Sequence, residues 1–268
     1  MVRQLDIPER LTSSAHALGP VGQCWIDDLP GVLASLEAEW SVRCGAPFDG
    51  GNAAYVTEAV MPDGARAVLK VALPAGIDGL SPFEQELKTL LLAQGDPYVG
   101  VIRHDTQRRS VLLERLGQPL ASLGWSTSRQ IEALSNTLAR GWRPVATEVL
   151  PTGAAKASWL VEFLSTAWED LGQPCSASAV ERAVTFSAER AARFDPDRAV
   201  LVHGDGHAHN LLVVPGSEDV PRFRLTNPRG SSPSPPTISA LSSEPGTTSC
   251  SPETRPSSRW SAARRWHR

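Results

Sequence analysis

The chain has 268 residues, of which 41% are hydrophobic, and this is enough to bury the core of one large domain or two small lobes. A formal net charge of −3 gives no reason to expect a nucleic-acid partner, and no apolar run approaches the roughly 20 residues of a membrane helix. Four scattered cysteines without a Cys-x-x-Cys pair argue against a zinc ribbon or a disulfide scaffold.

The N-terminal part of the chain predicts an extension followed by a helix. Residues 1–24 form the predicted extension. Their first ten positions carry four charged side chains where the apolar segment of a signal peptide would lie, so we expect a cytoplasmic protein. From Ile26 to Trp40, apolar residues recur at three- and four-residue spacing. This periodicity predicts an amphipathic helix that packs on the core.

Short β-like stretches follow this helix and predict a small antiparallel sheet. They cover residues 41–43, 54–61 and 66–72, with a Pro-Asp-Gly turn at 62–64. A glycine-rich loop at 50–52 joins the first two strands, and backbone amides in such a loop can approach phosphate oxygens because glycine has no Cβ. A plain hairpin loop is the competing interpretation.

Lys70 lies inside the apolar strand at 66–72, where a positive charge needs a partner. The next segment, residues 81–92, predicts a helix with Ser81 as its N-cap and a proline at its first position. This helix offers Glu84 and Glu86 as partners, of which we favour Glu86. A lysine whose ammonium group reaches solvent at a sheet edge is the alternative.

Residues 111–117 predict a further strand, after which the pattern becomes helical. Three sets of apolar residues at helical spacing indicate three helices, and the aromatic members are expected to pack in the core. The sets are Ile131, Leu134 and Leu138; Trp159, Leu160, Phe163, Leu164 and Trp168; and Val180, Val184, Ala188 and Ala191.

The most informative segment is residues 203–210, His-Gly-Asp-Gly-His-Ala-His-Asn, between predicted apolar strands at 199–202 and 211–214. Phosphoryl transfer needs a carboxylate beside the attacking hydroxyl and a further oxygen ligand for Mg²⁺. Asp205 and Asn210 have the separation of these two residues in the protein-kinase catalytic loop. The segment therefore predicts a phosphotransferase.

Two other interpretations of this segment remain. In the first interpretation, the segment is only a polar turn between two strands. In the second, alternating imidazole and carboxylate groups bind zinc in a hydrolase, although such sites usually need another ligand and an open position for water. The alternating residues are His203, Asp205, His207 and His209.

With these motifs, roughly residues 25 to 228 resemble the aminoglycoside and hydroxyurea resistance kinases, which are relatives of the protein kinases. The resemblance implies an α+β, two-lobed protein-kinase-like fold with a small antiparallel-sheet N-lobe and a mainly helical C-lobe. It divides the chain into the extension at 1–24, a nucleotide-binding N-lobe at 25–117 that ends in a hinge, a C-lobe with the catalytic loop at 118–228, and a tail at 229–268.

The resemblance also implies roles for individual residues, with ATP and Mg²⁺ as cofactors and a small antibiotic as the partner. Asp205 would orient or deprotonate the acceptor hydroxyl, and Asn210 and Asn227 would hold Mg²⁺. Lys70, paired with Glu86, would position the ATP phosphates. Backbone groups of the hinge residues Glu114, Arg115 and Leu116 would hold adenine.

The chain departs from the family pattern at position 227. A strand after the catalytic loop usually ends in an aspartate that binds Mg²⁺, followed by proline and, two residues on, glycine. Here the sequence reads Asn227-Pro228-Arg229-Gly230, so an amide occupies the aspartate position. An amide offers Mg²⁺ an oxygen but no negative charge. Activity of this sequence is therefore in question.

The segment after Asn227 is low in apolar residues: it holds 11 Ser and 7 Pro, and Ile238 and Leu241 are its only Ile, Leu, Val or Phe. Such a composition cannot build the helices of a kinase lobe. Back-translated with GC-rich codons and read one frame over, residues 232–239 give Ala-Glu-Pro-Ala-Tyr-Asp-Leu and residues 246–255 give Asn-Asp-Glu-Leu-Leu-Ala-Gly-Asp-Pro. We favour a frameshift over a disordered tail, and resequencing of the gene tests this.

Three hypotheses of function follow. The first is an ATP-dependent kinase that inactivates an antibiotic by phosphorylating a hydroxyl. Hydroxyurea is slightly preferred over a streptomycin-type aminoglycoside as acceptor. A polycationic aminoglycoside needs a pocket rich in carboxylates, and Glu244 and Glu253 are the only acidic residues after Asn227. The second is a catalytically inactive protein with a kinase fold, which would bind nucleotide without turnover. The third is the zinc hydrolase, which metal analysis of the purified protein would identify. The sequence does not predict an oligomeric state.

Overall fold

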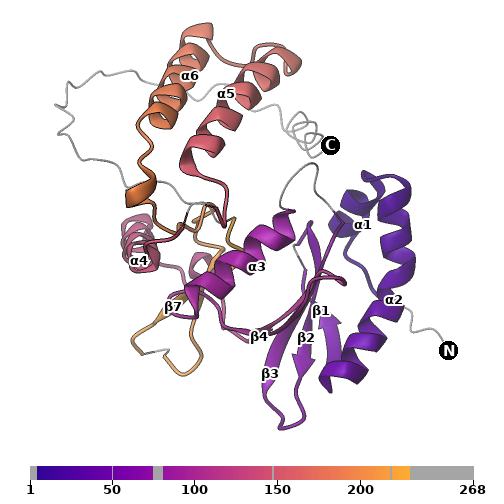
Figure 1. Ribbon diagram of the computed structural model, residues 1–268. Helices are drawn as coiled ribbons and strands as arrows, with labels where there is room; N and C mark the ends of the chain where they lie inside the picture. The colour runs from indigo at the N-terminus through magenta and orange to yellow at the C-terminus, as the bar shows by residue number, and fades with distance from the viewer. Residues whose placement is uncertain (1–4, 50, 75–80, 147, 218, 230–268) are drawn as a thin grey trace.

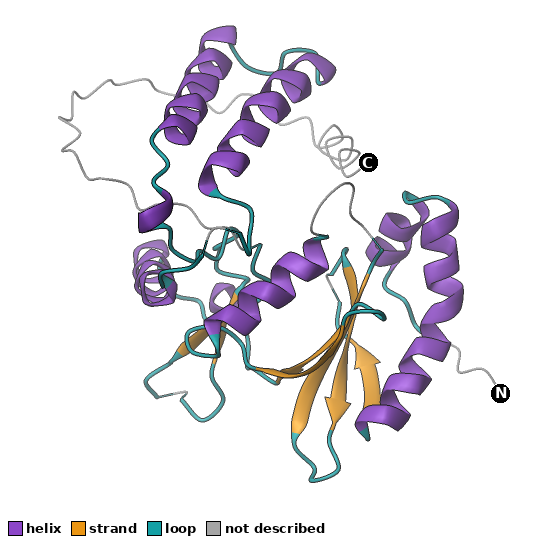
Figure 2. Ribbon diagram, viewed as in Figure 1, coloured by secondary structure: helices purple, strands orange, loops and turns teal. Residues whose placement is uncertain are grey.

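The computed structural model describes residues 5–49, 51–74, 81–146, 148–217 and 219–229 (Figure 1). Its N-terminal part is an antiparallel sheet with helices on both faces, and its C-terminal part is mainly helical (Figure 2). The predicted α+β fold class is thus confirmed. None of the helices in these ranges is long and apolar enough to span a membrane. Apart from Arg229, the predicted tail at 229–268 lies outside the described residues.

Five strands form the larger sheet, in the order β1-β2-β3-β5-β4. Every neighbouring pair is antiparallel. The central strand β3 matches the predicted stretch at 66–72, whereas the first strand begins two residues later than predicted because Ser41 takes a left-handed conformation that ends the preceding helix. The strands are β1 (Arg43–Pro47), β2 (Ala54–Val60), β3 (Arg66–Ala72), β4 (Val101–Asp105) and β5 (Ser110–Glu114).

Helices α1 (Glu9–His16) and α2 (Pro20–Trp40) cover one face of this sheet (Figure 1). Helix α2 contains the predicted amphipathic helix but begins six residues earlier, at a proline that follows Gly19. The boundary predicted between residues 24 and 25 therefore falls inside a helix. Leu11 and Ala15 of α1 are fully buried in the same apolar cluster as α2 and the sheet, so this segment packs on the core.

Helix α3 (Pro82–Ala93) lies on the opposite face of the sheet (Figure 1). Its first turn is closed by a capping box: the Ser81 hydroxyl accepts a hydrogen bond from the Glu84 N–H at 3.2 Å, and the Glu84 carboxylate accepts one from the Ser81 N–H at 2.8 Å. These hydrogen bonds hold the pKa of Glu84 below its usual value. The cap explains both where the helix begins and why Glu84 is not available to Lys70.

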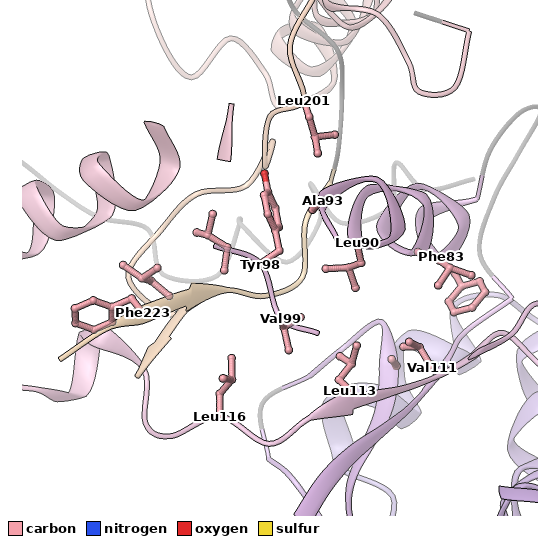
Figure 3. Close-up of a cluster of buried hydrophobic side chains, with 14 of the residues drawn as sticks. Phe83, Leu90, Ala93, Tyr98, Val99, Val111, Leu113, Leu116, Leu201 and Phe223 are labelled. Carbon is pink, nitrogen blue, oxygen red and sulfur yellow. The ribbon is translucent and has the colours of Figure 1, made fainter. Parts of the chain in front are cut away.

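A second apolar cluster joins the sheet to the C-terminal part (Figure 3). Val111 and Leu113 of β5 and Leu90 of α3 belong to it, together with Tyr98, which is 1% exposed. From the C-terminal part, Leu201 and the small sheet of β6 (Leu211–Val213) and β7 (Phe223–Leu225) join the same cluster. Because these side chains share one packed core, the segment that carries residues 203–210 is fixed relative to β3 and α3.

The predicted strand at 199–202 does not form. Its backbone makes only an isolated bridge, in which the Leu201 N–H donates to the Arg143 carbonyl at 2.7 Å and the Val145 N–H donates to the Ala199 carbonyl at 3.2 Å. The segment is apolar because Leu201 is buried in the core, and not because it lies in a sheet. The strand predicted at 211–214 is present as β6.

The described residues of the C-terminal part form three longer helices and two short 3₁₀ turns, and α5 and α6 pack side by side (Figure 1). Among the described residues α6 buries no side chain, and Trp159 on α5 stacks on Phe163 while remaining 51% exposed. The expectation that these aromatic residues lie in the core is therefore wrong for Trp159. The elements are η1 (Leu120–Ser122), α4 (Thr127–Gly141), α5 (Gly153–Asp170), α6 (Ala177–Ala192) and η2 (Pro196–Arg198).

The burial of α1 makes a testable prediction. Replacing the fully buried Leu11 by alanine leaves a cavity between α1, α2 and the sheet, and should lower the free energy of unfolding by about 2–5 kcal/mol. Leu91→Ala in α3 removes the same atoms from a side chain that is 44% exposed, and should cost less than about 1 kcal/mol. Urea denaturation measures both. Equal stability of the two variants would show that α1 is a loosely attached extension.

Candidate active site

Lys70 and Glu86 form the charged centre of the candidate site. Lys70 lies in the middle of β3, opposite Val56 and Val111 of the neighbouring strands. Its ammonium group donates to both carboxylate oxygens of Glu86 on α3, at 2.7 and 2.6 Å, and both side chains are about one-tenth exposed. The predicted partner of Lys70 is thus Glu86. Glu86 thus fixes the position of the Lys70 ammonium group at the face of the sheet where α3 packs.

The predicted hinge, Glu114 to Leu116, leads from β5 toward the C-terminal part. The Glu114 carboxylate accepts a hydrogen bond from the Gly100 N–H at 2.6 Å and pairs with Arg224 of β7, so this side chain anchors the hinge. Leu116 is buried, and among the described residues its backbone N–H has no hydrogen-bond partner. A free N–H at this place is what a nucleobase acceptor would need. Arg115 lies over the Phe48 ring at 4.7 Å from the ring centre.

The catalytic-loop segment is held by backbone hydrogen bonds to the residues after β7. The Thr226 N–H donates to the Asn210 carbonyl at 2.9 Å, and the Arg229 N–H donates to the His203 carbonyl at 2.7 Å. Gly204 takes a φ of +76°, and a Cβ built there would lie 2.1 Å from the Arg229 carbonyl oxygen. Glycine is therefore required at this position by both conformation and space. These contacts bring Asp205 and Asn227, which are distant in sequence, into one site.

His203 braces the loop from within the core. Its side chain is 2% exposed and stacks on Tyr98, with ring centres 5.9 Å apart. Nε2 lies 2.8 Å from the Thr226 carbonyl oxygen, and Nδ1 accepts a hydrogen bond from the Asp205 N–H at 3.2 Å. A neutral ring protonated at Nε2 satisfies both contacts. Burial lowers the pKa of His203, which keeps the ring in this neutral form.

Asp205 points its carboxylate into a partly exposed region that contains positive groups. The Arg229 Nε lies 3.4 Å from one carboxylate oxygen, and the His207 Nε2 lies 3.9 Å from the other. Lys156, in the first turn of α5, is close enough for Asp205 to affect its titration, and its pKa is lowered mainly by burial. The carboxylate is thus accessible, as a group that accepts a proton from a bound hydroxyl must be.

The two predicted metal ligands, Asn210 and Asn227, are brought together as a hydrogen-bonded pair. The Asn227 Nδ2 donates to the Asn210 Oδ1 at 3.1 Å, and the Asn227 Oδ1 accepts a hydrogen bond from Lys70 at 3.0 Å. Both amide oxygens are therefore already engaged, and the pair includes no carboxylate. Mg²⁺ in such sites is held through one or two carboxylates. The residues present do not fit a magnesium ion.

The zinc interpretation has no geometric support. Nowhere in the described residues do three or more His, Cys, Asp or Glu side chains converge on a point that could hold a metal. His203 is turned into the core toward Tyr98, whereas His207 and His209 are exposed and pack edge-to-face on each other. Although the three histidines alternate in sequence, the loop buries His203 and leaves His207 and His209 at the surface.

Sequence reasoning missed several residues of the site. Arg224 pairs with the hinge residue Glu114, and its alternation with buried neighbours in β7 was the only signal for it. Arg229 pairs with Asp205 although it lies in what was predicted to be the tail. Lys156 and Tyr98 carry no local motif, and the tertiary fold alone brings them to the catalytic loop.

Two curated relatives are similar in sequence. The chain is 35% identical to a streptomycin 6-kinase of Streptomyces glaucescens over 118 residues, which cover 42% of this chain and 35% of that kinase. It is 27% identical to a streptomycin 6-kinase of Streptomyces griseus over 218 residues, which cover 78% of this chain and 66% of that kinase. The chain resembles the antibiotic resistance kinases. It spans about one-third of the first relative and just under two-thirds of the second.

The fold is shared with a solved antibiotic-modifying enzyme. A macrolide 2′-phosphotransferase type I superposes with a TM-score of 0.51 at 13% identity, over 76% of this chain and 72% of that one. At this identity the likeness speaks for the fold alone, and it supports the predicted kinase-like architecture. No protein-family model matches the chain.

The environment of His203 predicts how stability depends on pH. Because its pKa is lower in the folded protein than the usual value of 6.5, the unfolded chain binds a proton first as the pH falls. The contribution of His203 to stability is therefore complete above pH 6.5 and is lost as the pH falls toward the folded-state pKa. His203→Gln should lower the free energy of unfolding by about 1–3 kcal/mol at pH 7.5 and should flatten its decrease toward pH 5.5.

Urea denaturation at the two pH values measures this difference, with His209→Gln as the matched control because His209 is exposed. The control should keep the pH dependence of the original chain. An unchanged slope in the His203 variant would show that other groups set the pH dependence.

Proposed function

We propose that the chain is a nucleotide-dependent phosphotransferase that phosphorylates a hydroxyl group of a small antibiotic. The observation that carries this proposal is the hydrogen-bonded link from the Lys70–Glu86 pair through Asn227 and Asn210 to the loop that holds Asp205. It joins a phosphate-positioning charge to a candidate base. The similarity to two streptomycin 6-kinases supports the same reaction class.

In the proposed reaction, ATP supplies the phosphoryl group and the chain supplies position and charge. The acceptor oxygen bonds to the terminal phosphorus as the bond to the bridging oxygen breaks, and ADP leaves. Asp205 orients the acceptor hydroxyl and takes its proton. Lys70 holds phosphate oxygens, and the Leu116 N–H, which has no partner among the described residues, donates to the base. A cytoplasmic location, where ATP is available, belongs to this proposal.

Streptomycin is the acceptor that the sequence relatives favour, because both are streptomycin 6-kinases. This changes the order predicted from the sequence, in which hydroxyurea came first. The acceptor in the proposed function is therefore a hydroxyl of a streptomycin-type aminoglycoside.

Hydroxyurea remains the second candidate because of the charges around Asp205. The positively charged Arg229 and Lys156 both lie near this carboxylate. A polycationic aminoglycoside would be repelled by such neighbours, whereas hydroxyurea is neutral and small. Removing a positive charge should therefore affect the two acceptors differently: Lys156→Met should lower the KM for streptomycin and leave the KM for hydroxyurea nearly unchanged.

The test is phosphate transfer from radiolabelled ATP by the purified full chain, with streptomycin and hydroxyurea offered separately. Asp205→Asn should lower the rate by about 10²–10⁴-fold, because it removes the proton acceptor while keeping the side-chain shape. ATP affinity should change little, since Asp205 does not contact Lys70 or the hinge in the structure. Asp197→Asn, the same change at an exposed position, should keep full activity.

Labelling of streptomycin supports the first acceptor, and labelling of hydroxyurea alone supports the second. An Asp205→Asn variant as active as the original chain would overturn the assignment of the base. If the chain binds ATP and labels neither acceptor, the result contradicts the proposed antibiotic phosphotransferase and supports the inactive protein with a kinase fold.

A further inference from the structure

Four polar side chains form a continuous line across the candidate site: Glu86, Lys70, Asn227 and Asn210. Lys70 donates to Glu86 and to the Asn227 Oδ1, the Asn227 Nδ2 donates to the Asn210 Oδ1, and the Asn210 Nδ2 donates to the Asp205 carbonyl at 3.0 Å. Each contact joins one donor to one acceptor. The line therefore has a single direction, from the ammonium group to the catalytic loop.

The groups at the two ends fix the orientation of both amides. A lysine ammonium can only donate, so the atom of Asn227 that faces it must be oxygen. A backbone carbonyl can only accept, so the atom of Asn210 that faces Asp205 must be the NH₂ group. The remaining contact then necessarily pairs the Asn227 NH₂ group with the Asn210 oxygen. No amide can be turned around without placing two donors or two acceptors face to face.

This arrangement engages the two amide oxygens that a cation would need as ligands. In the phosphoryl-transfer template, metal ions are held by the catalytic-loop asparagine and by an aspartate. Asn210 and Asn227 occupy these two positions here. A direct hydrogen bond joins them, and the ammonium group of Lys70, 3.0 Å from the Asn227 oxygen, would repel a cation placed there. Asn210 is 6% exposed, so its oxygen is satisfied inside the protein and not by solvent.

The charges near this line are also suited to phosphate without a metal. Lys70, Lys156 and Arg229 carry the positive groups, and Glu86 and Asp205 carry the negative ones. An aspartate at position 227 would add a second carboxylate beside Lys70, next to that of Glu86. Its replacement by asparagine removes one negative charge from the vicinity of a triphosphate, which lowers the repulsion that Mg²⁺ would otherwise have to screen.

We propose that the Asn227–Asn210 amide pair replaces the divalent metal in this chain, so that it binds ATP without Mg²⁺. The inference rests on the proposed function in one respect, because it takes the Lys70 site as the place of the nucleotide phosphates. Metal-free binding retains the nucleotide but loses the electrostatic stabilisation that a metal gives to the transferring group. Phosphoryl transfer by this chain is therefore slow, and position 227 limits it.

The experiment measures ATP binding by isothermal titration calorimetry, once with Mg²⁺ in excess and once with EDTA, using the full chain. The affinity of the original chain for ATP should differ by less than about threefold between the two conditions. Asn227→Asp should bind ATP at least about tenfold more tightly with Mg²⁺ than with EDTA, because the carboxylate creates a metal ligand and repels the uncomplexed triphosphate.

The matched control is Asn136→Asp, which adds the same charge at an exposed position of α4 and should behave as the original chain. Asn227 has a φ of +55°, a conformation that asparagine and aspartate both tolerate, so the variant should keep the fold. Thermal unfolding checks this. The result for the original chain decides the inference even if the variant does not fold.

The possible outcomes separate this inference from the proposed function. Binding of ATP by the original chain with Mg²⁺ but not with EDTA overturns the amide replacement and leaves the proposed function intact. No ATP binding under either condition overturns both. Equal binding under the two conditions, together with a metal dependence that appears only in Asn227→Asp, supports the inference. Mn²⁺ titration followed by electron paramagnetic resonance should likewise show a bound ion in the variant alone.

Discussion

A lysine inside an apolar strand is the constraint on which the site depends. Lys70 is flanked by Val56 and Val111 on neighbouring strands, and such a charge is costly unless it is paired and hydrogen-bonded. The structure meets this requirement from two sides, with Glu86 from α3 and Asn227 from the segment after β7. The same ammonium group therefore fixes the position of α3 on the sheet and ties the end of β7 to the N-terminal part.

The apolar packing makes these polar contacts possible. The cluster around Tyr98 joins β5 and α3 to Leu201 and the β6–β7 sheet (Figure 3), and it holds the catalytic loop within reach of Lys70. His203 connects the apolar cluster to the polar contacts. Its ring stacks on Tyr98, its Nδ1 accepts a hydrogen bond from the Asp205 N–H of the loop, and its Nε2 bonds the Thr226 carbonyl after β7. A buried imidazole thus transmits the rigidity of the core to the carboxylate of Asp205, two residues away.

The sequence predicted those features that depend on local chemistry. Alternation and turn residues gave the exact span of β3, and the Ser81 cap gave the start of α3 to within one residue. The cost of an unpaired buried charge predicted that Lys70 has a carboxylate partner on α3, and the family resemblance favoured Glu86 over Glu84. Tertiary contacts decided the rest: α1 has too short a pattern to indicate burial, and residues 199–202 are apolar for packing without being a strand. Arg229 reaches Asp205 only because the backbone after β7 returns to His203.

Position 227 separates what the fold requires from what metal binding requires. The backbone there needs a residue that tolerates positive φ, and Lys70 needs an acceptor; asparagine and aspartate satisfy both conditions equally. They differ in the terminal atom that faces the Asn210 Oδ1, which is the NH₂ group in asparagine and a carboxylate oxygen in aspartate. A carboxylate oxygen there would leave two acceptors opposed, and a cation would be needed between them. The amide of Asn227 supplies this donor itself, so the hydrogen bonds of the site are complete without an ion. Because both residues satisfy the backbone and Lys70, the fold is the same with asparagine as with aspartate.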